Sequence, residues 1–161
     1  MKRFKLPESV LVVIHTPSLD VLLLERADFP GFWQSVTGSR ASADEALVST
    51  CARETAEETG LVCLPSDFRD LQLIHRYTIY PQWRHRYAVE VTHNTEHVFG
   101  LEVPAPFTPQ LAPHEHVRFR WPPWRDAADA CFSWTNAQAI RTLAQRHACE
   151  AHGNAPGRGR T

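Results

Sequence analysis

Three glutamates in one short stretch of the chain have the type and spacing that could bind a metal ion. Glu54, Glu57 and Glu58 stand at positions i, i+3 and i+4, which places their side chains on one face if the stretch is helical. Like charges at this spacing cost a helix roughly 0.2 to 0.5 kcal/mol per pair unless a cation lies among them. Carboxylate oxygens suit magnesium or manganese. The alternative is a solvated acidic face on which Arg53 pairs with Glu57.

The residues around these glutamates follow a longer pattern. Gly38 is followed after six residues by Glu45, and after seven more by residues 53–61, which read RETAEETGL. This pattern resembles the signature of the Nudix hydrolases. The family has five residues after the glycine where this chain has six, and Thr55 replaces an aliphatic residue. Because the extra residue precedes the helix, we expect a remodelled loop with metal binding retained.

The resemblance implies a role for each of these positions. Glu54, Glu57 and Glu58 would bind Mg²⁺, with Mn²⁺ as a substitute, and Glu57, Glu58 and Arg53 would also act in catalysis. Arg53 and Glu45 would brace the loop against the helix. The remaining two are glycines: Gly38 would allow a tight turn, and Gly60 would end the helix.

A fourth carboxylate, Glu115, lies just before the last expected strand. In this family a general base or a further metal ligand often comes from a later loop, so Glu115 is the candidate for both roles. The alternative is a zinc site made by His114 and His116, but two histidines without a third ligand are a weak pattern. A bound Mg²⁺ would neutralise phosphate oxygens and help to form a nucleophilic water.

Segments outside the signature bear on the substrate. Residues 32–38, 84–88, 94–96 and 133–140 resemble the bacterial dihydroneopterin triphosphate diphosphatases, although that family tends to have Pro-Gly where this chain has Val89-Glu90. The resemblance implies hydrolysis of 7,8-dihydroneopterin 3′-triphosphate to the monophosphate and pyrophosphate, a step towards folate. It also allows activity on nucleotides such as dATP.

A pterin triphosphate needs cations for its phosphates and an aromatic wall with hydrogen bonds for its ring. Basic candidates match positions of the same family, although each could equally be a solvated surface charge. The aromatic candidates could instead belong to a sheet core, and Ser133 could simply cap a helix. The expected substrate-binding residues are Lys5, Arg26, Thr37, Tyr77, Thr78, Ile79, Tyr80, Arg84, Ser133 and Trp134.

Two other functions compete with this one. A broader nucleoside triphosphate pyrophosphohydrolase would act on dATP or oxidised nucleotides, and a non-catalytic Nudix module would only bind a nucleotide or a protein. The second usually lacks signature glutamates that are present here. Seventeen basic and eighteen acidic residues leave a net charge of -1, which argues against nucleic acid as a partner and favours a small molecule.

The elements that position these residues are expected to form an α+β fold. Its layers would be α/β/α, with a mixed central sheet between helices, as in the Nudix fold. Residues 10–14 and 21–24 are apolar runs joined by a turn, which predicts a hairpin of buried strands. A capping-box pattern at residues 42–45 predicts a helix start there, and a second pattern at 135–138 predicts a helix to about residue 148. The other expected elements are strands at 61–64, 71–80, 87–91, 97–103 and 117–121 and a helix at 124–130.

The length of 161 residues with 43% hydrophobic content fits one domain, over residues 1–149. Residues 150–161 are rich in Gly, Pro and Arg, so we expect a disordered tail. The four cysteines are far apart without a CxxC pair, which indicates reduced thiols. Without a long apolar run or a cleavage site, the sequence predicts a cytoplasmic protein, and it leaves the oligomeric state open.

Overall fold

The computed structural model describes residues 3–153, and its centre is a mixed four-stranded sheet in the order β4-β1-β6-β5. In β1 (Glu8–His15) every residue after the first is buried, as a continuous apolar run with strands on both sides requires. The neighbours of β1 are β4 (Val36–Ser39), which is antiparallel, and β6 (His93–Glu102), which is parallel. β5 (Arg69–Thr78) adds antiparallel to β6 at the edge.

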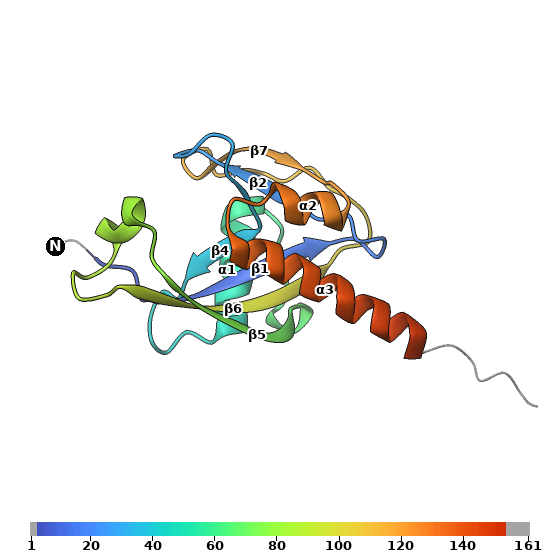
Figure 1. Cartoon of the computed structure of the whole chain (residues 1–161), viewed down its shortest axis with the longest axis horizontal. Helices are drawn as coiled ribbons and strands as arrows, with labels where there is room; N and C mark the ends of the chain where they lie inside the picture. Colours follow the sequence, from blue (N-terminus) through green and yellow to red (C-terminus); the bar gives the residue numbers. More distant parts are fainter. Residues whose placement is uncertain (1–2, 154–161) are drawn as a thin grey trace, which may run out of the picture.

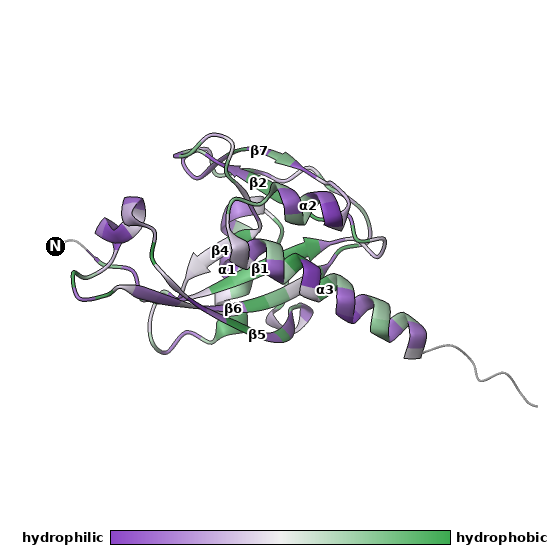
Figure 2. Ribbon diagram, in the orientation of Figure 1, coloured by the Kyte–Doolittle hydropathy of each residue, from purple (hydrophilic) through white to green (hydrophobic). Residues whose placement is uncertain are grey.

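Helices cover both faces of this sheet (Figure 1). α1 (Leu47–Thr59) packs on the face that carries Val10, through Cys51. On the opposite face, α2 (Trp124–Ala130) and α3 (Trp134–Gly153) pack against the side chains that alternate with these along β1. Figure 2 shows β1 and the adjoining part of β6 as the hydrophobic centre of the molecule. The predicted α/β/α layers with a mixed central sheet are therefore confirmed.

The expected hairpin is wrong, because its two strands join different sheets. β1 meets the second run only at a bridge between His15 and Val21. β2 (Leu23–Arg26) then forms a small antiparallel sheet with β3 (Trp33–Gln34) and β7 (His116–Arg120). A run that is buried on both faces has no alternation of polar and apolar residues to fix its partner, so the sequence could not specify the pairing.

Local predictions around α1 also need correction. The helix begins at Leu47, not at residues 42–45, because the Glu45 carboxylate accepts hydrogen bonds from Arg53 and Thr50 instead of capping the helix. Its end is as predicted, with Gly60 in the left-handed conformation at φ 76°. Residues 61–64 are not a strand; they lead into a short 3-10 helix, η1 (Pro65–Asp67).

The expected strand at residues 87–91 is absent as well. This segment follows a second 3-10 helix, η2 (Pro81–Arg86), and turns back through a hydrogen bond from Val91 N–H to Ala88 O. The turn leads into the start of β6. Because Val91 and Ala88 bond to each other within the turn, these main-chain groups are not available to pair with a neighbouring strand.

α3 differs from its prediction at both ends. It begins at Trp134 with Ser133 as its cap, since Ser133 Oγ accepts from the N–H of Asn136 at 3.3 Å. It continues to Gly153, so residues 150–153 are helical, not part of a tail; residues 154–161 lie outside the described residues. Among residues 3–153, no helix is both long and apolar enough to span a bilayer.

Candidate active site

The three glutamates of α1 lie where the helix passes β4. Glu54 and Glu58 are buried, with 9% and 3% of their surface exposed, whereas Glu57 is exposed. Gly38 makes the close approach of β4 feasible, because a Cβ at this position would lie 1.9 Å from Cδ of Glu54. Glycine is therefore required at position 38, because the Glu54 side chain occupies the space that a Cβ would take.

Burial of these carboxylates is costly without a cation. Burial raises the pKa of Glu54 to about 7, although Arg53 opposes the shift. Burial also raises the pKa of Glu58 well above its usual value, and the charges of Glu54 and Glu115 raise it further. Oε2 of Glu58 is buried and has no hydrogen-bond partner among residues 3–153. A divalent cation would offset both the desolvation and the repulsion, so this set of oxygen donors fits Mg²⁺ or Mn²⁺.

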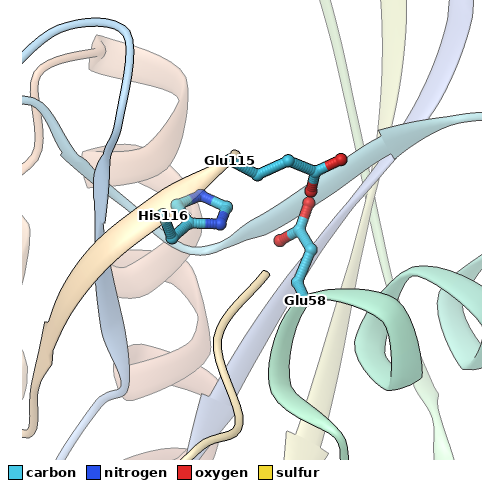
Figure 3. Close-up of side chains that lie close together, drawn as sticks. All are labelled: Glu58, Glu115 and His116. Atoms are coloured by element: carbon cyan, nitrogen blue, oxygen red, sulfur yellow. The ribbon is translucent and has the colours of Figure 1, made fainter. Parts of the chain in front are cut away.

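Glu115 reaches the same place from the start of β7. The ligand atoms of Glu58, Glu115 and His116 all lie within 4.8 Å of one another. Figure 3 shows the Glu115 carboxylate pointing towards that of Glu58, with the His116 ring beside them. Within residues 3–153 this group includes His116 but not His114, although both histidines line the same hollow.

His116 was not expected beside the carboxylates, and its surroundings keep it neutral. Burial and the charge of Arg26 lower the pKa of His116 to about 4. Nε2 of His116 lies 3.2 Å from the side-chain nitrogen of Gln34, which can only donate, so Nε2 accepts. A neutral ring adds no positive charge to the acidic group.

Arg53 connects the loop before α1 to the helix. Its guanidinium donates to Glu45 at 3.0 and 3.2 Å and to Oε1 of Glu54 at 2.8 Å. It also donates to the main-chain oxygen of Ser39 at 2.9 Å. The geometry matches a brace that orients Glu54, and it is maintained despite the additional residue in the loop.

A cavity of about 720 Å³, part of it open to solvent, lies on the other face of β4. Thr37 and Ser39 line it, and Gly38 between them faces α1, as the alternation of a strand requires. We call it the aromatic cavity, since its lining includes Tyr77, Tyr80, Trp83, Tyr87 and Phe132.

A second hollow, the acidic cleft, adjoins the aromatic cavity. It is lined by Glu54, Glu57, Glu58 and Glu115. The two hollows share Lys5, Arg26, Gln34, Thr37, Gly38 and Arg86. Three cationic side chains therefore stand at the border between an aromatic wall and a carboxylate cluster.

The structure brings most of the expected substrate-binding residues to this border. The expected residues that line the aromatic cavity are Lys5, Arg26, Thr37, Tyr77, Ile79, Tyr80 and Ser133. Ser133 does so while capping α3, so the two interpretations of this residue do not exclude each other.

Three expected residues lie elsewhere. Thr78 is exposed and contacts His93, because strand alternation points it away from its neighbours Tyr77 and Ile79. Arg84 donates to the main-chain oxygen of Val89 within the turn after η2. Trp134 is 56% exposed and packs against His75 outside the cavity. None of these three lines either hollow.

Several lining residues were missed by the sequence analysis. Arg86 takes the place expected for Arg84, two positions away in the same basic triplet, and lies 3.6 Å from Asp28. Asn94 and Glu96 line the aromatic cavity from β6. Their spacing of two in a strand was the signal that could have placed them on one face. Phe132 had no such signal, since it lies between two helices.

A family model described as the NUDIX domain matches residues 5–143. The chain therefore belongs to the Nudix family, and it is a Nudix hydrolase. The family generally uses divalent metal ions such as Mg²⁺.

Individual relatives within the family give a more specific comparison. A protein of Haemophilus influenzae named dihydroneopterin triphosphate diphosphatase is 40% identical over 144 residues, covering 88% of this chain and 89% of the relative. The Escherichia coli protein of the same name is 39% identical over 142 residues, or 86% and 93% of the two chains. The structure of the E. coli dihydroneopterin triphosphate pyrophosphohydrolase matches with a TM-score of 0.82 and 36% identity, covering 90% and 99%.

Proposed function

We propose that this chain hydrolyses 7,8-dihydroneopterin 3′-triphosphate to the monophosphate and pyrophosphate with the help of Mg²⁺. The observation that carries the proposal is the shared border of the aromatic cavity and the acidic cleft. A pterin ring in the cavity would direct its triphosphate past the cations of that border to the carboxylates. The names of relatives at about 40% identity support the same substrate.

In this proposal the four carboxylates hold the metal and prepare the water. Glu54, Glu57, Glu58 and Glu115 are the proposed ligands, and Glu57, Glu58 and Glu115 are the candidates to accept the proton of the attacking water. When bound, Mg²⁺ neutralises phosphate oxygens and lowers the pKa of a bound water. Arg53 acts as a positioning residue through its hydrogen bond to Glu54.

The cations at the border hold the phosphates. The guanidinium of Arg26 is fixed by Asp28 at 2.8 Å and lies over the ring of Trp83 at 4.3 Å. This geometry keeps Arg26 oriented before the substrate arrives, which lowers the entropic cost of binding. Lys5 and Arg86 line both hollows and supply two more positive charges.

The aromatic cavity suits a flat ring. Between ring centroids, Phe132 stands 5.9 Å from Tyr80 in a tilted arrangement and 5.7 Å from Trp83 in a T-shaped one. Such a cluster is preformed and offers both faces and edges to a ligand. The partner is then a small phosphorylated molecule, and four free cysteines agree with the cytoplasmic location expected from the sequence.

Product analysis tests this proposal. The chain is incubated with dihydroneopterin triphosphate and Mg²⁺, and the products are separated by ion-exchange chromatography. We expect the monophosphate and pyrophosphate in equal amounts, and no turnover when a chelator removes the metal. Release of single phosphates, or unchanged turnover with the chelator, would refute the proposed reaction.

A second candidate, a nucleoside triphosphate pyrophosphohydrolase acting on dATP or oxidised nucleotides, has one observation in its favour. In the proposed arrangement, the acidic cleft and the cations at its border would contact only the phosphates of a ligand. A purine could therefore take the place of the pterin. A kcat/KM for dATP well above that for the pterin would favour this candidate.

A further inference from the structure

A carboxylate outside the acidic cleft lies in the wall of the aromatic cavity. Glu96 is 3% exposed and lines the cavity together with Asn94, which is 1% exposed. The two residues are two positions apart in β6, so their side chains project from the same face of the sheet. Ser9 in β1 and Tyr77 in β5 pair with them and line the same cavity.

His75 in β5 fixes the Glu96 carboxylate. Nδ1 of His75 lies 3.2 Å from Oε1 of Glu96, and because a carboxylate only accepts, the imidazole donates. On its other side the ring contacts Gln138 of α3, with 3.0 Å between Nε2 and Oε1, and Trp134 packs edge-on against it. Within residues 3–153, the bond from His75 is the only hydrogen bond to this carboxylate. A buried carboxylate with one partner has unused acceptor capacity.

Asn94 adds a second unused acceptor. Its amide nitrogen donates to Ser9 Oγ at 2.7 Å and to the Tyr77 hydroxyl at 3.1 Å. Its Oδ1 is buried and has no hydrogen-bond partner in the described part of the chain. A buried polar atom without a partner is rare in proteins and costs stability. The wall of the cavity therefore presents hydrogen-bond acceptors from two neighbouring side chains. It is complementary to a ligand that carries hydrogen-bond donors.

We propose that Glu96, with Asn94 beside it, accepts the N–H groups of a 2-amino-4-oxopyrimidine ring edge and so determines specificity for the pterin. Such an edge presents two adjacent donors, at N3 and at the 2-amino group, which match the two oxygens of one carboxylate. The inference rests on the proposed function and adds the group that recognises the ring.

The same pair discriminates against adenine. The equivalent edge of adenine presents one donor, the 6-amino group, beside an acceptor, N1. The N1 lone pair would face a carboxylate oxygen, so only one of the two hydrogen bonds can form. A bidentate match is typically worth roughly a 10- to 100-fold preference.

The test compares kcat/KM for dihydroneopterin triphosphate and for dATP in three chains: wild type, Glu96→Gln and Glu102→Gln. Glutamine keeps the shape of Glu96 but turns one acceptor into a donor that opposes the ring. We expect Glu96→Gln to lower kcat/KM for the pterin roughly 10- to 100-fold, mainly through KM, and to leave that for dATP equal or higher, because the amide can accept from the 6-amino group and donate to N1 of adenine. Glu102 is exposed on the same strand, so its variant should leave both substrates unaffected.

Equal losses on both substrates, or no loss on either, would overturn the inference. A wild-type chain without pterin turnover would instead contradict the proposed function. Because Glu96 is buried beside His75, thermal unfolding is measured for each variant. If Glu96→Gln does not fold, Glu96→Asp keeps the charge but withdraws the oxygens by one methylene, and the same selective loss on the pterin is expected.

Discussion

Glu58 combines burial, a raised pKa and an oxygen without a partner in the described part of the chain, and it lies against Glu115 from another segment. Its helical spacing with Glu54 and Glu57 was readable from the sequence, because a helix places i, i+3 and i+4 together. The contribution of His116 was not readable, because it depends on where β7 begins relative to α1. Residues with a local spacing rule could be predicted from the pattern itself, whereas residues that meet across the fold, such as Glu115, were expected only through the family resemblance.

The substitution Glu58→Gln tests the metal site at this scale. It keeps the size of the side chain and removes its charge, so we expect turnover of any substrate to fall roughly 100- to 10,000-fold. Steady-state kinetics with saturating Mg²⁺ measures the loss. Glu90→Gln is the matched control, since Glu90 is exposed and outside both hollows. Turnover within about twofold of wild type in Glu58→Gln would rule out the assigned role.

Gly38→Ala tests the contact between β4 and the helix. The added Cβ would overlap Glu54, so the carboxylate must move, and we expect a loss of stability of about 1 to 3 kcal/mol and a large loss of activity. Urea unfolding and kinetics measure the two effects. Gly153→Ala is the control, because a Cβ there meets nothing within 4 Å. Full activity in Gly38→Ala would show that Glu54 can be displaced without consequence.

At the scale of elements, the sequence predicted that α1 is a helix preceded by a loop, but it did not predict the residue at which the helix begins. The end of the helix followed from Gly60, whose conformation only glycine adopts easily. Its start did not follow from the capping box, because Glu45 bonds to Arg53, a partner eight positions away. The family resemblance predicted the brace and the local pattern predicted the cap. In the structure Glu45 forms the brace with Arg53 and also accepts from Thr50, and it does not cap the helix.

The brace gives the protein a specific sensitivity to acid. Arg53 is the main cause that lowers the pKa of Glu45 from 4.5 to about 2. The folded state therefore binds fewer protons than the unfolded state between these values, and the stabilisation is fully present above pH 4.5 and lost as the pH falls towards 2. We expect Glu45→Gln to lower the free energy of unfolding by about 1 to 3 kcal/mol at pH 7.

The difference between Glu45→Gln and wild type should shrink at pH 3, as measured by urea unfolding at both pH values. Asp44→Asn is the control, since Asp44 is an exposed neighbour and should change little. A difference that stays constant between pH 7 and pH 3 would show that the charge of Glu45 is not what stabilises the loop.

At the scale of the whole molecule, the two halves of the proposed site come from opposite faces of the central sheet. The carboxylates of α1 and the wall formed by η2 and β6 meet only around β4, where the cations Lys5, Arg26 and Arg86 also gather. The layers followed from the sequence because helical and strand periodicities differ. The partners of β2 depend on tertiary packing and were not predictable, and Glu115 was expected near the metal only through the family resemblance.

Metal binding should stabilise the whole fold. If Mg²⁺ binds only the folded chain, a concentration 100 times its Kd adds about 2.7 kcal/mol to the free energy of unfolding. We expect thermal unfolding to shift upwards with Mg²⁺, to return with a chelator, and to shift less in Glu58→Gln at the same Mg²⁺ concentration, because that variant keeps three of the four proposed ligands. An equal shift in this variant would place the metal elsewhere.

The most direct test of the account is a crystal structure of Glu58→Gln with Mg²⁺ and dihydroneopterin triphosphate, since the slow variant should preserve the substrate. We expect the pterin ring in the aromatic cavity against Glu96, and the triphosphate crossing Lys5, Arg26 and Arg86 to the metal at Glu54, Glu57 and Glu115. A ring bound outside the cavity, with the phosphates still at the metal, would contradict the claim that the two hollows form one pterin triphosphate site.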